Sequence, residues 1–367
     1  YKRQRPQWGD PESTWLRKEG FNGHDWAFCM LLNFGSNVGL YGKLQHVVDE
    51  YYKARQSKFA STLKGVGLTM EGIENNPVMY ELVSELPWRN NKFGWQEWLN
   101  NYVEARYGNI NNTKVHDAWM LLARSVYGAS DKVLEQGCHE SVLCARPALD
   151  VYQVSSWSEM EEFYNPDDVI RAAQLMVEAS HEVKANANFR YDLVDITRQA
   201  IAEKARYVYA EIVAAYRAKD RKMFDYTTRR FLDIILQQDR LLSSIPDFMV
   251  GTWIRSARNL GTNTQESNHY EWNARVQITT WGNRDAAEKG GLREYAHKEW
   301  NGVLADFYYP RWKVYFEALA DTFDGKPMKN IDFYAMDEAW TLKHNVYPYE
   351  AQGDAVEFAQ KAAAEVL

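Results

Sequence analysis

Two short apolar runs near the start of the chain have the length and the flanking residues of buried β-strands. The first covers residues 26–32 and stops at Asn33, and the second covers residues 66–70 and stops at Glu71. Apolar side chains recur at helical spacing over residues 38–58, and another helical stretch follows the second run. The order strand, helix, strand, helix is typical of a parallel sheet with helical crossovers.

The rest of the chain has an almost purely helical pattern. Helices are predicted over residues 95–106, 167–177, 191–217, 224–242, 248–259, 270–280, 292–307, 312–323 and 355–366. Because no repeat period and no low-complexity linker separates these stretches, we expect them to form one compact, bundle-like domain. The predicted domains are residues 1–92, with the strand–helix units, and residues 93–367, which are all helical.

The small number of predicted strands is a physical anomaly. A (β/α) barrel needs eight strands and about 250 residues, and a two-stranded parallel sheet cannot cover its own faces or edges. The predicted fold class is therefore α/β plus all-α: the last βα units of an incomplete (β/α) barrel, followed by a large α-helical bundle domain. We hypothesise that the chain is the C-terminal portion of a larger enzyme, completed by preceding sequence or by a second chain.

Charge and apolar content exclude two classes of partner. The chain of 367 residues carries 43 Lys and Arg against 50 Asp and Glu, a formal charge of −7. Nucleic-acid binding by bulk charge is not expected, because phosphate contacts need clustered cations. No segment approaches the roughly 18 unbroken apolar residues of a membrane span. The 14 Trp, 23 Tyr and 15 Phe residues suit either a thick core or a sugar-binding cleft.

The sequence predicts neither a cofactor nor a metal site. The glycines near residue 65 do not have the spacing of a dinucleotide fingerprint, and the eight histidines include no pair at i, i+4 and no Cys/His ligand spacing. A serine nucleophile elbow is also absent from the sequence. Three cysteines do not describe a disulfide framework, and Cys29 is expected to be an inert packing residue inside a strand.

Two polar residues at the strand ends are candidates for chemistry. Glu71 places a carboxylate at the carboxyl end of a strand, where parallel barrels carry catalytic groups. It could instead be a first-turn acid for the following helix, with Asn75 and Asn76 as competing N-caps. Asn33 ends the first strand in the same way. Its amide could bind a ligand hydroxyl, or it could be a turn residue that binds neighbouring backbone groups.

Two aromatic residues of the helical region are further candidates. Trp281 closes a predicted helix, and Tyr295 begins the next one after a glycine-bearing loop. Such rings could line a ligand cleft, although an aromatic residue at a helix end is more often part of a core between domains.

Five blocks of sequence, in order along the whole chain, resemble glycoside hydrolase family 89, the α-N-acetylglucosaminidases. They are residues 29–37, 65–82, 86–89, 189–199 and 307–312. The resemblance implies a small N-terminal domain, a (β/α) barrel and an all-helical C-terminal domain that supplies one wall of the active site. It also implies a retaining exo-glycosidase that releases terminal non-reducing α-linked N-acetyl-D-glucosamine from glycans without a cofactor.

The resemblance also assigns roles to residues. Glu71 falls on the catalytic nucleophile of the family, and the general acid/base falls on an earlier strand, outside this chain. Glu74 and Glu81 are poorly placed to replace it, because they follow Glu71 instead of lying across the sugar from it. Substrate-binding positions of the barrel fall on Leu31 and Phe34, and those of the helical domain fall on His139, Trp281, Leu292 and Tyr295. Asn33 joins the predicted substrate-binding residues from its place at the strand end. For His139, a hydrogen-bonded core histidine is an open alternative.

Retaining hydrolysis needs two carboxyl groups about 5–5.5 Å apart. We therefore expect activity only together with the N-terminal barrel portion of the same enzyme, and a glycan with terminal α-N-acetylglucosamine as the substrate. The alternative is a non-catalytic carbohydrate-binding or helical scaffold fragment. The family implies an extracytoplasmic location, which is periplasmic or secreted, or lysosomal in a eukaryote.

Overall fold

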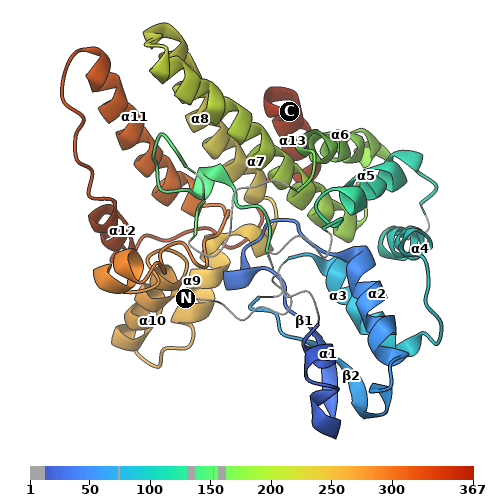
Figure 1. Cartoon of the computed structure of the whole chain (residues 1–367). Helices are drawn as coiled ribbons and strands as arrows, with labels where there is room; N and C mark the ends of the chain where they lie inside the picture. Colours follow the sequence, from blue (N-terminus) through green and yellow to red (C-terminus); the bar gives the residue numbers. More distant parts are fainter. Residues whose placement is uncertain (1–12, 73–74, 109, 130–136, 152, 156–162) are drawn as a thin grey trace. The chain divides into compact units, whose positions relative to one another are not determined.

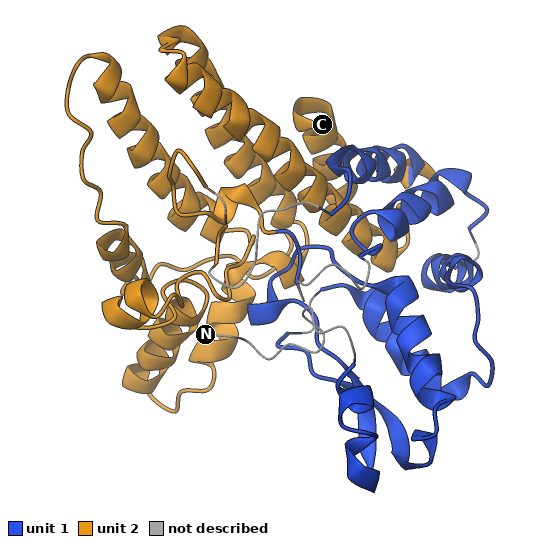
Figure 2. Ribbon diagram, viewed as in Figure 1, with its two compact units in different colours: residues 1–139, 161–179 blue, residues 140–160, 180–367 orange. Residues whose placement is uncertain are grey.

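The computed structural model describes residues 13–72, 75–108, 110–129, 137–151, 153–155 and 163–367 (Figure 1). The chain divides into two compact units (Figure 2). Unit 1 consists of residues 1–139 and 161–179, and unit 2 consists of residues 140–160 and 180–367. Unit 1 thus extends beyond the strand–helix region, and a domain boundary at residue 92 stays a prediction.

Unit 1 contains a two-stranded parallel sheet with helical connections. Strands β1 (Trp26–Met30) and β2 (Leu63–Leu68) pair in parallel, with α2 (Leu44–Arg55) between them and α3 (Pro77–Glu85) after β2. The two predicted βα units are therefore confirmed. Because the strands are parallel, their carboxyl ends lie at one edge of the sheet.

The strands are less buried than their apolar sequence predicts. In β1 only Met30 is buried, and β2 has no buried residue. The expectation that Cys29 is a packing residue inside the strand is wrong, because its side chain is exposed. The physical reason is that a sheet of two strands leaves faces and edges without neighbours.

The other helices of unit 1 are short or amphipathic. The helix α5 is capped by Asn112, whose side chain accepts hydrogen bonds from the amides of Lys114 and Val115. The stacked rings of Trp119 and Tyr127 belong to the core of this unit. The bounds are α1 (Thr14–Arg17), α4 (Trp95–Tyr107), α5 (Thr113–Arg124) and α6 (Pro166–Val183), the last ending in unit 2, with short 3₁₀ turns η1 (Phe21–Gly23), η2 (Phe34–Ser36), η3 (Ala60–Thr62) and η4 (Leu86–Trp88).

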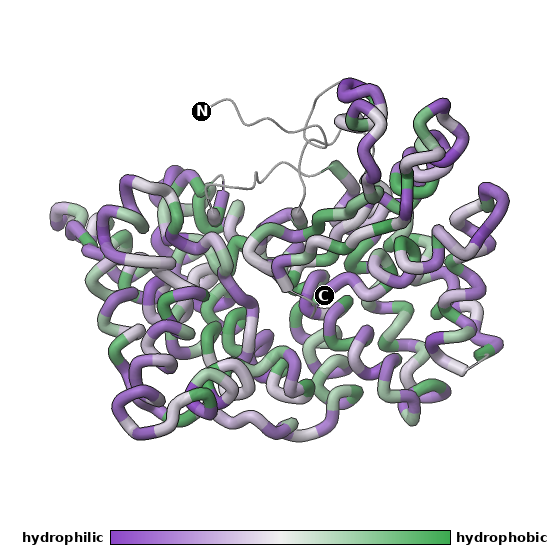
Figure 3. Tube along the Cα trace, turned by 90° about the horizontal axis from the view of Figure 1, so that it is seen from below, coloured by the Kyte–Doolittle hydropathy of each residue, from purple (hydrophilic) through white to green (hydrophobic). Residues whose placement is uncertain are grey.

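Unit 2 is built around a long helical hairpin. Its two arms, α7 (Ala187–Arg217) and α8 (Arg221–Leu242), are joined by a short loop and pack side by side (Figure 1). Hydrophobic and hydrophilic residues alternate along the helices (Figure 3). The remaining elements are α9 (Val250–Arg258), α10 (Thr264–Gln277), α11 (Tyr309–Phe323), α12 (Phe333–Thr341), α13 (Ala355–Val366), the 3₁₀ turns η5 (Val142–Cys144) and η6 (Pro246–Phe248), and the π turns η7 (Asp285–Lys289) and η8 (Leu304–Tyr308).

The predicted helix over residues 292–307 is wrong. Residues 293–296 form a turn, and helical structure in this stretch begins only at residue 303, just before the π turn η8. The amide of Asn301 donates to the carbonyl of Phe248 over 2.8 Å, and Met249 forms a parallel β-bridge with Asn301. A buried neighbouring segment therefore takes the backbone hydrogen bonds that a helix would use, and this overrides the helical spacing of the apolar residues.

Candidate active site

Glu71 lies at the edge of the sheet where both strands end. Just before it, the amide and hydroxyl of Thr69 both donate to the carbonyl of Met30, each over 3.0 Å, which ties the two strand ends together. The side chain of Glu71 is exposed, and its Oε2 accepts a hydrogen bond from the amide of Gly35 over 2.6 Å. The loop after β1 therefore orients the carboxylate that follows β2.

Asn33 is a buried turn residue. Its Nδ2 donates to the carbonyls of Asn37 and Gly39 over 2.6 and 2.7 Å, and its backbone is left-handed, with φ of 47°. The amide nitrogen of Asn33 therefore has the role of a turn residue, as the second alternative expected. The carbonyls that it binds lie four and six residues further along the chain. The Oδ1 atom is buried and has no hydrogen-bond partner among the described residues. Binding of a ligand hydroxyl by Asn33 stays a prediction.

Asn75 and Asn76 do not cap helix α3 through their side chains. Asn76 occupies the N-cap position, but its Oδ1 accepts from the amide of Tyr41 over 2.9 Å and its Nδ2 donates to Gly39 over 3.1 Å. The Nδ2 of Asn75 donates to Asn37 over 3.2 Å. We call Asn33, Asn75 and Asn76 the asparagine cluster. It joins the loop after β1 to the segment before α3, a role that the sequence analysis missed.

The other barrel-side candidates flank this loop. Leu31 and Phe34 are half-buried and lie on either side of the Leu32–Asn33 pair, and Phe34 directly precedes Gly35. His139, which the resemblance assigns to the helical domain, falls at the end of unit 1 and is 5% exposed. Its burial fits the alternative of a core histidine, and a part in substrate binding stays a prediction. The structure thus brings Leu31, Asn33, Phe34 and Glu71 to the same edge of the sheet.

The helical-domain candidates come together within unit 2. The ring centroids of Trp281 and Tyr295 lie 5.1 Å apart in an edge arrangement. Trp281 remains 37% exposed, so it has a face available to a ligand. Leu292 is half-buried, and its carbonyl accepts from the amide of Tyr295 over 3.2 Å. Trp281 is not the end of a helix, because α10 ends at Gln277 and a turn intervenes.

Three further carboxyl groups, those of Glu74, Glu81 and Glu140, bear on the question of a second group to act with Glu71. Glu74 lies outside the described residues, and Glu81 is part of helix α3. Burial raises the pKa of Glu81, an effect opposed by Arg106. Glu140 of unit 2 is fully buried, and its oxygens accept from the Val154 and Ser155 amides over 3.0 and 2.8 Å and from the Ser155 hydroxyl. Glu140 therefore serves as a structural acceptor.

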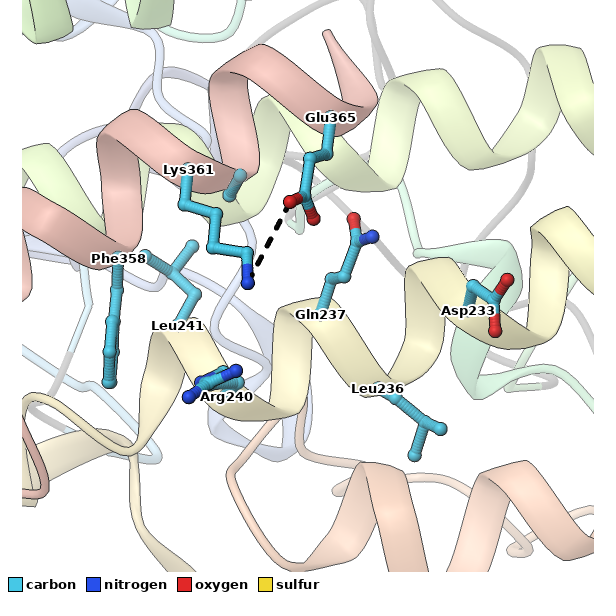
Figure 4. Close-up of a pocket in the computed structure, with 9 residues that line it drawn as sticks. Asp233, Leu236, Gln237, Arg240, Leu241, Phe358, Lys361 and Glu365 are labelled. Carbon is cyan, nitrogen blue, oxygen red and sulfur yellow. Dashed lines mark ion pairs between the residues drawn. The ribbon is translucent and has the colours of Figure 1, made fainter.

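A cavity of about 270 Å³ between α8 and α13 is a separate feature (Figure 4). Its lining includes Arg240, Phe358 and the ion pair of Lys361 with Glu365, and it contains none of the candidate site residues in the described part of the chain. Across the same described residues, no group of three or more His, Cys, Asp and Glu side chains could hold a metal ion. None of the described helices has the length and apolar content needed to span a membrane.

Two family models match the chain in sequence order. The alpha-N-acetylglucosaminidase (NAGLU) tim-barrel domain matches residues 7–90, and the NAGLU C-terminal domain matches residues 98–365. The chain therefore belongs to the alpha-N-acetylglucosaminidase family. Its fold combines part of the barrel domain with the helical C-terminal domain, which confirms the predicted fold class.

Individual relatives agree with the family assignment. Human alpha-N-acetylglucosaminidase is 33% identical over 359 residues, which cover 96% of this chain and 46% of the human protein. A family 89 glycoside hydrolase from Clostridium perfringens in complex with PUGNAc superposes with a TM-score of 0.91 at 30% identity, over 97% of this chain and 40% of that one. Another structure is a variant of the Clostridium enzyme, with two glutamates changed to glutamine, in complex with its substrate GlcNAc-alpha-1,4-galactose. It has the same TM-score and identity, over 96% of this chain and 40% of that one. The chain spans less than half the length of these relatives.

Proposed function

We propose that the chain is the nucleophile-bearing part of a retaining exo-glycosidase. Its substrate would be a glycan with terminal non-reducing α-linked N-acetyl-D-glucosamine. Membership of the family and the substrate of the Clostridium relative support this proposal. The observation that carries it is the position of Glu71, a carboxylate at the carboxyl ends of two parallel strands, oriented by the Gly35 amide.

In the proposed mechanism, the Glu71 carboxylate attacks the anomeric carbon while the bond from that carbon to the leaving oxygen breaks. A second carboxyl group donates its proton to the leaving oxygen. Water then hydrolyses the glycosyl-enzyme ester, and the second group, now a carboxylate, takes the proton of that water. This second group would come from the N-terminal portion of the same enzyme, as preceding sequence or as a second chain.

The binding residues have a different task in the proposal. Leu31, Asn33 and Phe34 would bind the sugar from the barrel part, and the helical domain would contribute His139, Trp281, Leu292 and Tyr295. Aromatic faces exclude water from a pyranose. In a dry site the charge of Glu71 would interact strongly with the oxocarbenium-like transition state. The family implies that such an enzyme acts outside the cytosol.

The decisive experiment uses the chain completed by its N-terminal barrel portion and an aryl α-N-acetylglucosaminide. We expect Glu71→Gln and Glu71→Ala to lose nearly all turnover. Added azide should restore turnover in Glu71→Ala and yield the β-glycosyl azide, because the anion attacks from the face that the carboxylate has vacated. Normal turnover by Glu71→Gln would refute the assignment.

A second measurement tests whether the other barrel portion is needed. The folded chain alone should bind sugar weakly and hydrolyse nothing, whereas the completed enzyme should hydrolyse the aryl glycoside. If the completed, folded enzyme binds the sugar and never hydrolyses it, the non-catalytic carbohydrate-binding alternative is the correct one.

A further inference from the structure

The ring pair of Trp281 and Tyr295 rests on two residues with unusual backbone. Trp281 itself and Glu294, the residue before Tyr295, both have φ of 59°. Residues other than glycine avoid this left-handed region, and a bulky residue adopts it only where the surroundings hold it. Such positions often occur at functional sites, where surrounding groups hold the strained backbone in place.

Every polar group of the Glu294 backbone has a bonding partner. Its amide donates to the carbonyl of Thr279 over 2.8 Å. Its carbonyl accepts from the amide of His297 over 3.2 Å and lies 2.9 Å from Nδ1 of the same histidine. Because Thr279 lies two residues before Trp281, the first of these bonds joins the turn that carries Trp281 to the turn that carries Tyr295.

The carboxylate of Glu294 is anchored in the protein interior. It forms an ion pair with Arg311 and accepts a hydrogen bond from the Tyr308 hydroxyl over 3.1 Å. Glu294 and Arg311 are each 1% exposed. Burial alone would lower the pKa of Arg311, but the charges of Asp337 and Glu294 raise it, so the guanidinium stays charged. The guanidinium also lies over the ring of Phe307, 4.8 Å from its centroid.

We propose that Glu294 and Arg311 are positioning residues for the Trp281–Tyr295 ring pair. The buried ion pair holds Glu294 in the left-handed conformation, and this conformation directs Tyr295 toward Trp281. The inference rests on the proposed function, in which these rings hold the sugar. It adds that sugar affinity depends on a buried charge pair that does not itself touch the sugar.

The test uses the completed enzyme with the Glu294→Gln, Tyr295→Ala and double variants. We measure KM and kcat on an aryl α-N-acetylglucosaminide and the inhibition constant of free N-acetylglucosamine. Glu294→Gln keeps the shape of the side chain and removes its charge, so KM and the inhibition constant should rise about tenfold. In the Tyr295→Ala background the same substitution should add no further increase, because the ring that it positions is gone.

A matched control separates positioning from general destabilisation. Glu271 is 2% exposed and pairs with Arg258 and Arg275 in the same unit. Glu271→Gln should lower thermal stability and leave KM and the inhibition constant unchanged. Should Glu294→Gln fail to fold, Arg311→Lys changes the same ion pair from the other side and should raise both constants.

The outcomes distinguish failure of this inference from failure of the proposed function. An equal rise in KM with and without the Tyr295 ring overturns the inference, as does a loss of stability with unchanged constants. If Trp281→Ala and Tyr295→Ala themselves leave both constants unchanged, the rings do not hold the sugar. In that case the pocket assignment of the proposed function fails, and the inference fails with it.

Discussion

The amide of Gly35 donates a hydrogen bond to Oε2 of Glu71 over 2.6 Å, so a residue after the first strand holds the carboxylate after the second. Gly35 has φ of 64°, a conformation that glycine adopts without strain. A glycine in the neighbouring loop therefore contributes to the orientation of the proposed nucleophile.

Gly35→Ala should impair the proposed catalysis. Alanine at this left-handed position is disfavoured by about 1 kcal/mol, and relief of that strain would move the amide away from Glu71. We expect kcat of the completed enzyme to fall about tenfold. Gly108→Ala is the control, because Gly108 has φ of 83° at the end of α4, with open space around an added Cβ. Equal losses of kcat in both variants would contradict the prediction.

The asparagine cluster should contribute measurably to stability. Asn33→Ala removes two buried hydrogen bonds, to Asn37 and Gly39, and should lower the free energy of unfolding by about 2 kcal/mol. Asn33 and Asn75 donate to the same carbonyl, that of Asn37. The double alanine variant should therefore lose more than the sum of the single variants in urea unfolding. Strict additivity would show that the two amides act independently.

The side chain of Asp239 should make stability depend on pH. Burial raises its pKa from 3.8 to about 6, opposed by hydrogen bonds from the amides of Gly302 and Ala305. Because its pKa is higher in the folded state, the protonated Asp239 carboxyl group adds to the free energy of unfolding below pH 3.8. This stabilisation is lost as the pH rises through about 6. The shift of 6 − 3.8 = 2.2 corresponds to at most about 3 kcal/mol.

Asp239→Asn removes this titration. The free energy of unfolding should be measured for both proteins from pH 4 to pH 7. The native protein should lose up to about 3 kcal/mol relative to the variant over this range. A constant difference, or a relative gain by the native protein at higher pH, would show that the pKa of Asp239 is not raised.

Phe231 should be a major contributor to the core of unit 2. It is fully buried, and its ring centroid lies 4.9 Å from that of Trp312 and 5.7 Å from that of Phe316. Phe231→Ala should lower the free energy of unfolding by about 3–5 kcal/mol. Leu236 lies on the same helix but is 41% exposed, and Leu236→Ala should change stability by less than about 0.5 kcal/mol. Similar losses in both would contradict the packing described.

The reactivity of the exposed Cys29 thiol tests whether further strands cover β1 in the completed enzyme. Cys138 and Cys144 are buried, so a thiol reagent should modify Cys29 in the native chain much faster than either of them. Addition of the N-terminal barrel portion should slow this reaction, because neighbouring strands would cover β1. Peptide mapping after brief labelling measures the rate at each cysteine. An unchanged rate at Cys29 in the active, completed enzyme would argue that β1 stays uncovered.

The sequence predicted those features that depend on local spacing. The helix at Ala355–Val366 has the predicted bounds, and the position of Glu71 followed from the rule that parallel strands end at one edge. The helix predicted over residues 292–307 failed because backbone amides of this stretch bond to segments distant in sequence, that of Glu294 to Thr279 and that of Asn301 to Phe248. Periodicity carries no information about such partners.

In the candidate site too, the sequence predicted local features and missed those that depend on long-range contacts. Asn76 precedes a proline and looked like a helix cap, but its hydrogen-bond partners lie in residues 39–41, which only the folded chain brings near. The pairing of Trp281 with Tyr295 likewise depends on two turns joined by one backbone hydrogen bond. Residue types therefore indicated the chemistry, and long-range contacts determined which groups meet.

The asparagine cluster has a consequence for protein engineering. Its side-chain amides form hydrogen bonds between the two segments that follow β1 and β2, so these segments form one structural unit. A graft that exchanges residues 33–41 alone for those of a relative would change the placement of the backbone groups that Asn75 and Asn76 bind. Redesign of specificity at this rim should transplant both segments at once.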